Sequence, residues 1–242
     1  MILPDGRSLH GINDASIRIG LRLSKDETIV RMPFEVRHMG SKYPIFSFDF
    51  TGAKRGVLPA SYDYLRLEGR MQYRLNLPPV GYSRLMLEGG KIFGKVPYLL
   101  LKLHEGNGTY FYGRYAFSCM NFYEFSSDAW ISFFYEHHFN GFLLGRVPLL
   151  KKLNWREVFV FKGVYGTLSA RNDGSLPNTK AVMLFPVGMS SVEHPYLETG
   201  FGIENIFRLL RVDFIWRLTH HRPIPGLSIP TFTVNFSLNL KF

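Results

Sequence analysis

The last eleven residues, Phe232-Thr-Val-Asn-Phe-Ser-Leu-Asn-Leu-Lys-Phe242, alternate between apolar and polar side chains without interruption. Successive side chains of a β-strand point to opposite faces, so this period of two predicts a strand with one apolar and one polar face. The segment is longer than the roughly 5–6 residues usual in soluble proteins and matches the roughly 9–11 residues with which a tilted strand crosses a bilayer. Its apolar set is Phe232, Val234, Phe236, Leu238, Leu240 and Phe242.

The same alternation recurs throughout the chain. In residues 65–77, the odd positions are mostly apolar and the even positions are all polar or charged. Other clear segments are 16–23 and 210–219, and looser ones are 43–52, 81–93, 115–126, 129–140, 155–168 and 195–205. Turn residues separate them, and no segment carries an apolar stripe of helical period. We therefore predict an all-β protein of about ten antiparallel strands with little helix.

The composition is compatible with a membrane-spanning β-protein. The chain has 242 residues, is 46% hydrophobic and 16% aromatic, and has a mean hydropathy of -0.02. Alternating strands average to such a value, and no apolar run of about 18 residues predicts a transmembrane helix. Cys119 is the only cysteine, which excludes an internal disulfide framework and a multi-cysteine zinc site. The net charge of +10 is spread among the strand-like segments rather than gathered in a block.

Two architectures have strands of this kind, a soluble β-sandwich and a transmembrane β-barrel. Long strands favour the barrel, and so do polar faces that carry charges of both signs, which a water-filled or plugged lumen accommodates. Some connections are short and others long, namely 94–114, 169–194 and 220–230, as in outer-membrane barrels. We predict an antiparallel transmembrane β-barrel or part of one. Aromatic residues near strand ends also suit a membrane interface: Tyr62, Tyr64, Tyr82, Tyr115, Trp130, Phe139, Trp155, Tyr196 and Phe242.

Several stretches resemble a Gram-negative outer-membrane family of unknown function, described as a carboxypeptidase-regulatory-like domain followed by a barrel. They are Gly40-Ser-Lys-Tyr-Pro-Ile45, Leu87-Glu-Gly-Gly-Lys-Ile-Phe-Gly94, Tyr115-Ala-Phe-Ser-Cys-Met-Asn-Phe-Tyr-Glu-Phe125, Glu136-His-His-Phe-Asn-Gly-Phe142 and Pro148-Leu-Leu-Lys-Lys-Leu-Asn-Trp-Arg-Glu157. Residues 196–218 distantly resemble the penultimate strands of the surface-antigen barrel superfamily, which contains outer-membrane assembly proteins. Its Arg-Gly-Phe loop motif has only a distant counterpart in Gly113-Arg-Tyr115.

The resemblance implies a place in the bacterial outer membrane. It also implies that the alternating C-terminal strand ending at Phe242 is the signal read by the barrel assembly machinery during insertion. Met1-Ile-Leu-Pro-Asp-Gly6 lacks the basic and apolar regions of a signal peptide. We therefore expect residues 1–242 to be a single barrel region and a C-terminal fragment of a longer protein. The carboxypeptidase label refers to a binding-type domain and implies no peptidase activity.

The charges on the predicted lumen face form the one constellation that suggests a function. An ion-paired network filling a narrow interior is one interpretation, and an anion-attracting passage is the other. The residues are Arg66, Glu68, Arg70, Arg74, Arg84, Glu88, Glu198, Arg211, Asp213 and Arg217.

Motifs for catalysis, metals or cofactors are weak. His137 and His138 are adjacent, so on a strand they point to opposite faces and cannot share one ion, while Glu136 and His138 supply too few ligands. His220 and His221 lie at a strand end. No catalytic serine or zinc-protease motif occurs.

We therefore expect a non-enzymatic outer-membrane barrel with a structural, transport or assembly-related role, without cofactor or metal. Its expected partners are outer-membrane lipid and the insertion machinery, not nucleic acid. Three alternatives stay open: a fragment of a TonB-dependent receptor barrel, a membrane-embedded hydrolase with a Ser/His pair, and a soluble basic β-protein that binds nucleic acid.

Overall fold

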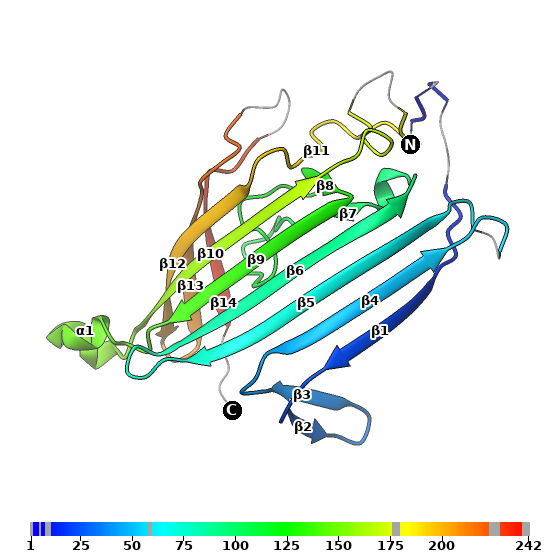
Figure 1. Cartoon of the computed structure of the whole chain (residues 1–242). Coiled ribbons are helices and arrows are strands. Elements are labelled where there is room, and N and C mark those ends of the chain that lie inside the picture. The colour runs from blue at the N-terminus through cyan, green and yellow to red at the C-terminus, as the bar shows by residue number, and fades with distance from the viewer. Residues whose placement is uncertain are drawn as a thin grey trace.

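A strongly curved antiparallel sheet of nine strands forms the body of the computed structural model (Figure 1). The structure describes residues 2–4, 6–7, 11–57, 60–175, 180–222 and 228–238. Along the sheet the strands are β1 (Ile17–Leu23), β4 (Ile45–Ala53), β5 (Tyr64–Asn76), β6 (Tyr82–Gly94), β9 (Ala129–His138), β10 (Arg156–Thr167), β12 (Tyr196–Ile206), β13 (Leu210–Arg217) and β14 (Phe232–Leu238).

The smaller elements lie in the connections between these strands. A hairpin of β2 (Thr28–Arg31) and β3 (Val36–Gly40) joins β1 to β4, and β7 (Lys102–Leu103), β8 (Phe125–Ser127) and β11 (Ser190–Ser191) form a three-stranded sheet. Among the described residues, the one α-helix is the six-residue α1 (Pro148–Leu153), accompanied by 3-10 turns at Tyr98–Leu100 and Leu144–Arg146. No helix in the described part of the chain has the length and apolar character needed to cross a membrane.

The prediction of an all-β, antiparallel fold is confirmed, and closure into a cylinder is not seen. The strand order begins at β1 and ends at β14, and the described residues contain no ladder between these two. Nine of the ten alternating segments coincide with strands of the main sheet. The prediction of a strand over 115–126 is wrong, because most of this segment is an irregular loop inside the curved sheet. The β2–β3 hairpin was not predicted.

The connections fall into two groups at opposite ends of the strands (Figure 1). The end that carries β7, β8 and β11 is called the β8 end, and it holds the connections 54–63, 95–128, 168–195 and 218–231. The opposite end is called the α1 end, and it holds 77–81, 139–155, 207–209 and the β2–β3 hairpin. The longest irregular connection, 95–124, turns back from the β8 end into the concave side and is called the inner loop.

The two faces of the sheet have opposite character. The registers of neighbouring strands keep one set of apolar residues on the convex face: for example, Leu21 pairs with Phe48 and Phe159 with Phe201. Many of these convex-face side chains are exposed, namely Ile17, Ile19, Leu21, Leu23, Phe46, Phe48, Phe50, Leu65, Leu75, Phe93, Ile131, Phe159, Tyr165, Phe201, Trp216, Phe232, Phe236 and Leu238. The concave face carries buried charged and polar side chains and contacts the inner loop.

Part of the inner loop packs as a core against the concave face. Phe117 and Met120 of the inner loop, with Phe125 of β8 directly after it, are buried against Phe134 and Tyr196 of the sheet. This packing explains the misleading alternation of 115–126. Phe117, Cys119, Met120 and Phe125 are buried under the sheet, whereas Tyr115, Phe122 and Tyr123 are exposed. Side chains of the sheet satisfy part of the loop backbone in place of a neighbouring strand.

The inner loop also covers the outer edge of β14. The Tyr112 amide donates to the Phe236 carbonyl oxygen over 2.8 Å, and the Phe236 amide donates to the Tyr110 carbonyl oxygen over 2.7 Å. Phe236 faces Val212 across the β13–β14 ladder, but its amide and carbonyl both bond the loop and therefore point away from β13. The last strand is therefore held on both sides, once by a strand and once by a loop.

Candidate functional site

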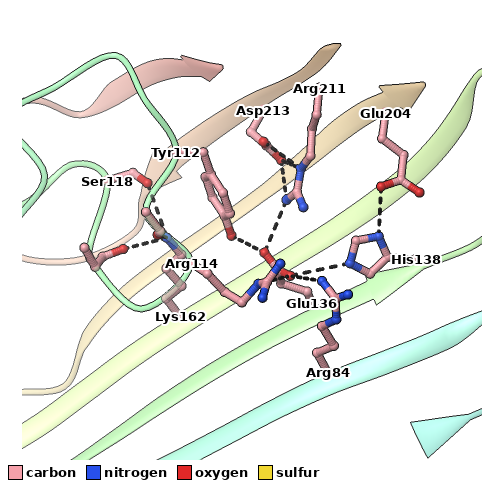
Figure 2. A network of polar contacts seen from close by, with 12 residues as sticks. Arg84, Tyr112, Arg114, Ser118, Glu136, His138, Lys162, Glu204, Arg211 and Asp213 are labelled. Carbon is pink, nitrogen blue, oxygen red and sulfur yellow. Dashed lines mark hydrogen bonds and ion pairs between the residues drawn. The ribbon is translucent and has the colours of Figure 1, made fainter. Parts of the chain in front are cut away.

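Glu136 on β9 is the centre of a buried polar network (Figure 2). Its Oε1 accepts hydrogen bonds from the Tyr112 hydroxyl at 2.6 Å and from Arg211 Nη2 at 3.3 Å. Its Oε2 lies 3.1 Å from Arg114 Nε and 3.4 Å from His138 Nε2. A buried carboxylate is stable only when it is paired and hydrogen-bonded, and here the partners come from two strands and the inner loop.

The remaining charges of this cluster are arranged to balance one another. Arg211 donates to both carboxylate oxygens of Asp213, with Nε 2.8 Å from Oδ2 and Nη2 2.7 Å from Oδ1. Arg84 Nη1 is 4.0 Å from Glu136 Oε2. Gly202 makes room for the pair, because a Cβ there would lie 2.3 Å from Asp213 Oδ1. Close packing against Asp213 therefore explains why β12 has a glycine at position 202.

Lys162 on β10 holds the inner loop by a different chemistry. It is buried, and its Nζ donates to the carbonyl oxygens of Gly113 at 2.9 Å and Ala116 at 2.6 Å, with Ser118 Oγ at 3.4 Å. An ammonium has three protons to donate, so these contacts satisfy it. The ammonium also lies 4.4 Å from the centre of the Tyr112 ring. Figure 2 shows Lys162 reaching from the sheet to the loop that carries Tyr112 and Ser118.

Two further wall residues fix the next part of the inner loop. Glu198 on β12 accepts the amides of Ser118 at 2.8 Å and Cys119 at 2.7 Å. Arg217 on β13 makes a two-pronged contact with Glu124, with Nη2–Oε1 at 2.6 Å and Nη1–Oε2 at 3.2 Å. Backbone amides and a carboxylate of the loop are thus satisfied by strands that come much later in the chain.

A second charged cluster surrounds Glu88 on β6. Arg70 Nη2 and Lys102 Nζ each approach its carboxylate to 2.6 Å. These three residues line a cavity of about 220 Å³ between the wall and the inner loop, together with His104 and Tyr115. A smaller adjoining cavity shares Arg70 and Glu88. Around Glu88 the concave side is therefore filled by ion pairs and by part of the inner loop, with small cavities between them.

Three ionisable groups of the inner loop have shifted pKa values. Burial lowers the pKa of His104 to about 3, and the nearby Lys102 ammonium lowers it further. Burial and the Glu198 carboxylate raise the pKa of the Cys119 thiol to about 12. Burial and the Glu136 carboxylate also raise the pKa of the Tyr112 hydroxyl well above its usual value. All three groups are therefore held in their neutral forms near neutral pH.

The structure divides the predicted lumen network into separate clusters. Arg84, Arg211 and Asp213 gather around Glu136, Arg70 joins Glu88, and Arg66 Nη2 pairs with Glu68 Oε1 at 2.8 Å. Glu198 and Arg217 bind the inner loop instead of one another. Arg74 lies over the Tyr82 ring at 4.2 Å, on an exposed part of the sheet.

Sequence reasoning missed several of the central residues. The sequence suggests Glu136 only as a weak metal ligand or as an interface or lumen side chain, and Arg114 only as part of a loop motif. It does not single out Lys102, Tyr112, Glu124 or Lys162 as site residues. The alternation of 129–140 offered one signal, since it places Glu136 on the same face as Ser132 and Phe134. The inner-loop partners carry no local pattern that distinguishes them from other loop residues. Among the described residues no group of three potential ligands could hold a metal ion.

Two serine–histidine contacts occur among the described residues, His104–Ser127 between the inner loop and β8 and Ser83–His137 on the convex face near the α1 end. Ser83 Oγ is 2.8 Å from His137 Nδ1 and 3.0 Å from the Tyr135 hydroxyl. His137 Nε2 lies 3.0 Å from the Val80 carbonyl oxygen, which can only accept, so Nε2 carries the proton and Nδ1 accepts from Ser83. Ser83 and His137 are both buried. The pair is satisfied as it stands and has no exposed nucleophile.

The residues of the predicted insertion signal can be placed in part. Phe232, Phe236 and Leu238 lie exposed on the convex face of β14, and Val234 is half-buried on the same face. The alternating Asn235 is buried, and its Nδ2 donates to the Thr109 carbonyl oxygen of the inner loop at 3.1 Å. Leu240 and Phe242 lie outside the described residues.

Comparison with known proteins gives a family and a fold. In structure, the chain is similar to BamA from Haemophilus ducreyi, determined without POTRA domains 1–3, with a TM-score of 0.51 and 10% sequence identity. The match covers 93% of this chain and 42% of the BamA chain, so at this identity it shows the fold alone. No curated protein sequence matches the chain. The sequence profile of a family of unknown function, the DUF5686 C-terminal domain, matches residues 10–170. The chain therefore belongs to the DUF5686 family, whose C-terminal domain it carries.

Proposed function

We propose that this chain is the wall and inner loop of a β-barrel in the bacterial outer membrane, with a structural, transport or assembly-related role and no catalytic activity. One observation carries the proposal: the sheet is inside-out relative to a soluble sandwich. Its apolar side chains are exposed on the convex face, whereas ionised side chains are buried on the concave face. A soluble sheet buries its apolar face, and a barrel wall in lipid exposes it.

The fold similarity to BamA supports the same location. An open sheet edge is costly in hydrocarbon, so the proposal also requires that the edges of the sheet be closed in the membrane. The resemblance to proteins with a carboxypeptidase-regulatory-like domain belongs to this proposal, as does insertion through the strand that ends at Phe242. The expected partners are membrane lipid and the insertion machinery. TonB-dependent receptors and soluble nucleic-acid-binding proteins are the alternatives that an experiment must separate from it.

Spin labels on neighbouring residues of β4 test the proposal directly. Phe48 is exposed on the convex face, and Ser47 lies on the concave face. Single cysteines at these positions, in a Cys119→Ala background, are labelled and the protein is reconstituted in lipid vesicles. Oxygen, which concentrates in hydrocarbon, should relax the label at position 48 more than the label at 47. Equal accessibility of both labels to a water-soluble relaxant would contradict a membrane wall.

A narrow ion passage is a second candidate, favoured by the cavity of about 220 Å³ that Arg70, Glu88 and Lys102 line. Because Glu88 pairs with both Arg70 and Lys102, neither positive charge is free to attract an anion, and the parent protein should conduct ions poorly. Planar-bilayer recordings of the full-length protein and of its Glu88→Gln variant test this. A passage is supported if the variant changes anion-to-cation selectivity, and opposed if neither protein conducts.

A further inference from the structure

The connection 139–155 at the α1 end has a composition unlike that of an ordinary solvated loop. It contains three basic residues, Arg146, Lys151 and Lys152, and no acidic residue. Leu143, Val147 and Leu153 are 51%, 44% and 49% exposed. On α1, Leu150 and Leu153 are three positions apart and share a side of the helix, whereas Lys151 and Lys152 lie on the other. Exposed aliphatic side chains beside basic ones are the pattern of a segment at a membrane interface.

This connection is held rigidly rather than left loose. The Phe139 amide donates to the Glu157 carbonyl oxygen at 3.0 Å, and the Glu157 carboxylate accepts the Leu144 amide. Asn154 ends α1 with a left-handed φ of 53°. The Arg146 guanidinium lies 4.2 Å from the centre of the Phe142 ring. Its exposed residues are therefore presented in one arrangement, and Figure 1 shows α1 extending away from the sheet.

The turn from β12 to β13 presents the same chemistry beside it. Asn205 Nδ2 donates to the Asn154 carbonyl oxygen at 2.8 Å, which joins this turn to the α1 connection. Phe207 is 87% exposed, and both Phe207 and Arg208 have positive φ values, 49° and 66°. Such backbone favours glycine or asparagine, so an aromatic and an arginine here are locally unfavourable. Strained residues that are also exposed suggest a contact outside the chain.

The position along the strands places both segments at the boundary of the apolar band. On the convex face of β9, Ile131 and Phe133 are followed by Tyr135 and then by His137, and the α1 connection begins two residues later. Ser83 hydrogen-bonds His137 in the same row. On β6 and β9 the apolar row therefore ends here, next to the α1 connection, at the level where headgroups begin if the wall spans a bilayer.

We propose that residues 139–155, with the turn at 207–209, form a foot that lies in the headgroup layer and binds anionic phospholipid. This inference rests on the proposed membrane location. The leucines and Phe207 enter the upper acyl region, while Arg146, Lys151, Lys152 and Arg208 meet lipid phosphates. Each basic residue near an anionic surface raises the population of the bound contact by roughly fivefold. The foot thereby fixes the depth and tilt of the wall on that side.

Lipid-borne quenchers test the foot in the reconstituted chain. A fluorophore is attached at Leu153→Cys, or separately at Phe48→Cys on the wall, in a Cys119→Ala background. Vesicles contain phosphatidylcholine alone or mixed with phosphatidylglycerol, and a nitroxide on the headgroup or acyl chain quenches the probe. We expect quenching at position 153 to rise severalfold with phosphatidylglycerol and to fall again at high salt.

A variant that lacks the three basic residues of the foot, and its matched control, test whether these charges cause the dependence on phosphatidylglycerol. Arg146→Gln/Lys151→Gln/Lys152→Gln should abolish the phosphatidylglycerol dependence at position 153. Lys54→Gln/Arg55→Gln/Arg171→Gln, which removes three exposed basic residues at the β8 end, should leave it intact. Two results would overturn the foot and leave the membrane wall in place. One is quenching of the probe at position 48 without quenching of the probe at position 153. The other is a phosphatidylglycerol dependence at position 153 that survives in the Arg146→Gln/Lys151→Gln/Lys152→Gln variant. If the wall probe also stays unquenched, the membrane location fails and the foot fails with it.

Discussion

Arg217 on β13 and Glu124 in the inner loop form a fully buried ion pair that joins residues 93 positions apart in the chain. The guanidinium also donates to the carbonyl oxygens of Cys119 at 3.2 Å and His220 at 2.7 Å, so the contact is part of a network. Pairs of this kind seldom add net stability relative to an apolar replacement of both partners. Removing one partner is nevertheless strongly destabilising, because the other charge stays buried without compensation.

Arg217→Met should therefore lower the free energy of unfolding by about 3–5 kcal/mol. Urea denaturation in lipid vesicles, followed by tryptophan fluorescence, measures this value. Arg74→Met is the matched control, since Arg74 is exposed over the Tyr82 ring and its loss should cost about 1 kcal/mol or less. Equal effects of the two substitutions would show that the inner loop is not anchored through Arg217.

Cys119 should react very slowly with maleimides. Its thiol is buried, and its pKa is raised to about 12 by burial and by Glu198. The thiolate fraction at pH 8 is then about a thousandfold smaller than that of an ordinary cysteine. Glu198→Gln weakens the hold on the Ser118 and Cys119 amides and should accelerate labelling at least about tenfold.

The control for this labelling experiment is Glu68→Gln. Glu68 bonds Arg66 on its own strand and does not contact the inner loop's amides. Mass spectrometry of timed, quenched samples gives the rates. If both variants label as slowly as the parent, Glu198 does not hold the loop in place.

Acid should destabilise the folded chain through His104. Burial depresses the folded-state pKa of His104 to about 3, below the ordinary value of 6.5. The unfolded state therefore binds the proton first as pH falls, and stability that is fully present above pH 6.5 is lost progressively as pH falls toward 3. Between pH 7 and pH 5 this loss is about 2 kcal/mol.

The His104→Gln variant should unfold with a smaller difference between these two pH values, because glutamine does not titrate. Glutamine can also donate to Ser127 Oγ, which His104 Nε2 contacts at 2.9 Å. His221→Gln, at an exposed histidine, controls for the removal of a titratable ring. A parent protein whose unfolding midpoint is the same at both pH values is the outcome that opposes the assignment.

A charge placed on the wall should be tolerated on one face only. Phe48→Glu puts a carboxylate on the convex face in the middle of β4 and should lower the free energy of unfolding in lipid by about 2 kcal/mol. Ser47→Glu puts the same group next to Arg22 and Arg70 on the concave face, where it should cost less than about 0.5 kcal/mol. For a soluble β-sandwich in detergent-free buffer, Ser47→Glu would cost more free energy of unfolding than Phe48→Glu.

The buried Ser83–His137 pair should not support hydrolysis. Because Ser83 is covered and its partners are satisfied, phospholipid or ester turnover by the purified chain should be the same with and without Ser83→Ala. The assay needs an active-site-directed fluorophosphonate as a second readout, which should label neither protein. Turnover that disappears in Ser83→Ala would favour the membrane-embedded hydrolase.

The strands were predictable because their side chains alternate over lengths that leave little choice of structure. β14 follows the pattern without an error over its described residues, residues 65–77 depart from it only at Gly69, and the register keeps the apolar positions on one face. The segment 115–126 alternates too, but its apolar residues pack against Phe134 and Tyr196 while Lys162 and Glu198 satisfy its backbone. Alternation reports that one side of a segment is buried, and it does not report whether a neighbouring strand lies beside it.

Of the candidate site, only residues on the strands could be predicted from the sequence. Arg211, Asp213 and Arg217 were recognisable because they occupy the polar face of a clear strand. Tyr112 and Arg114, which bind Glu136, and Glu124, which binds Arg217, come from an irregular loop whose path depends on contacts with distant strands. Sequence periodicity carries no information on such pairings, because they depend on how distant segments of the chain pack together and not on local spacing.

The anchoring of the inner loop also fixes an order of events in folding. Residues 110–124 precede β9, yet their partners Glu198, Arg217 and Phe236 lie far downstream, in β12, β13 and β14. Contacts that close loops of this size are slow to form, and the loop has nowhere stable to rest before they exist. Because Phe236 lies in β14, pairing of that strand and fixing of the inner loop are one step. A chain that stalls before this step would leave buried charges of the concave face without their loop partners, so pairing of β14 serves as a checkpoint for the nine-stranded sheet.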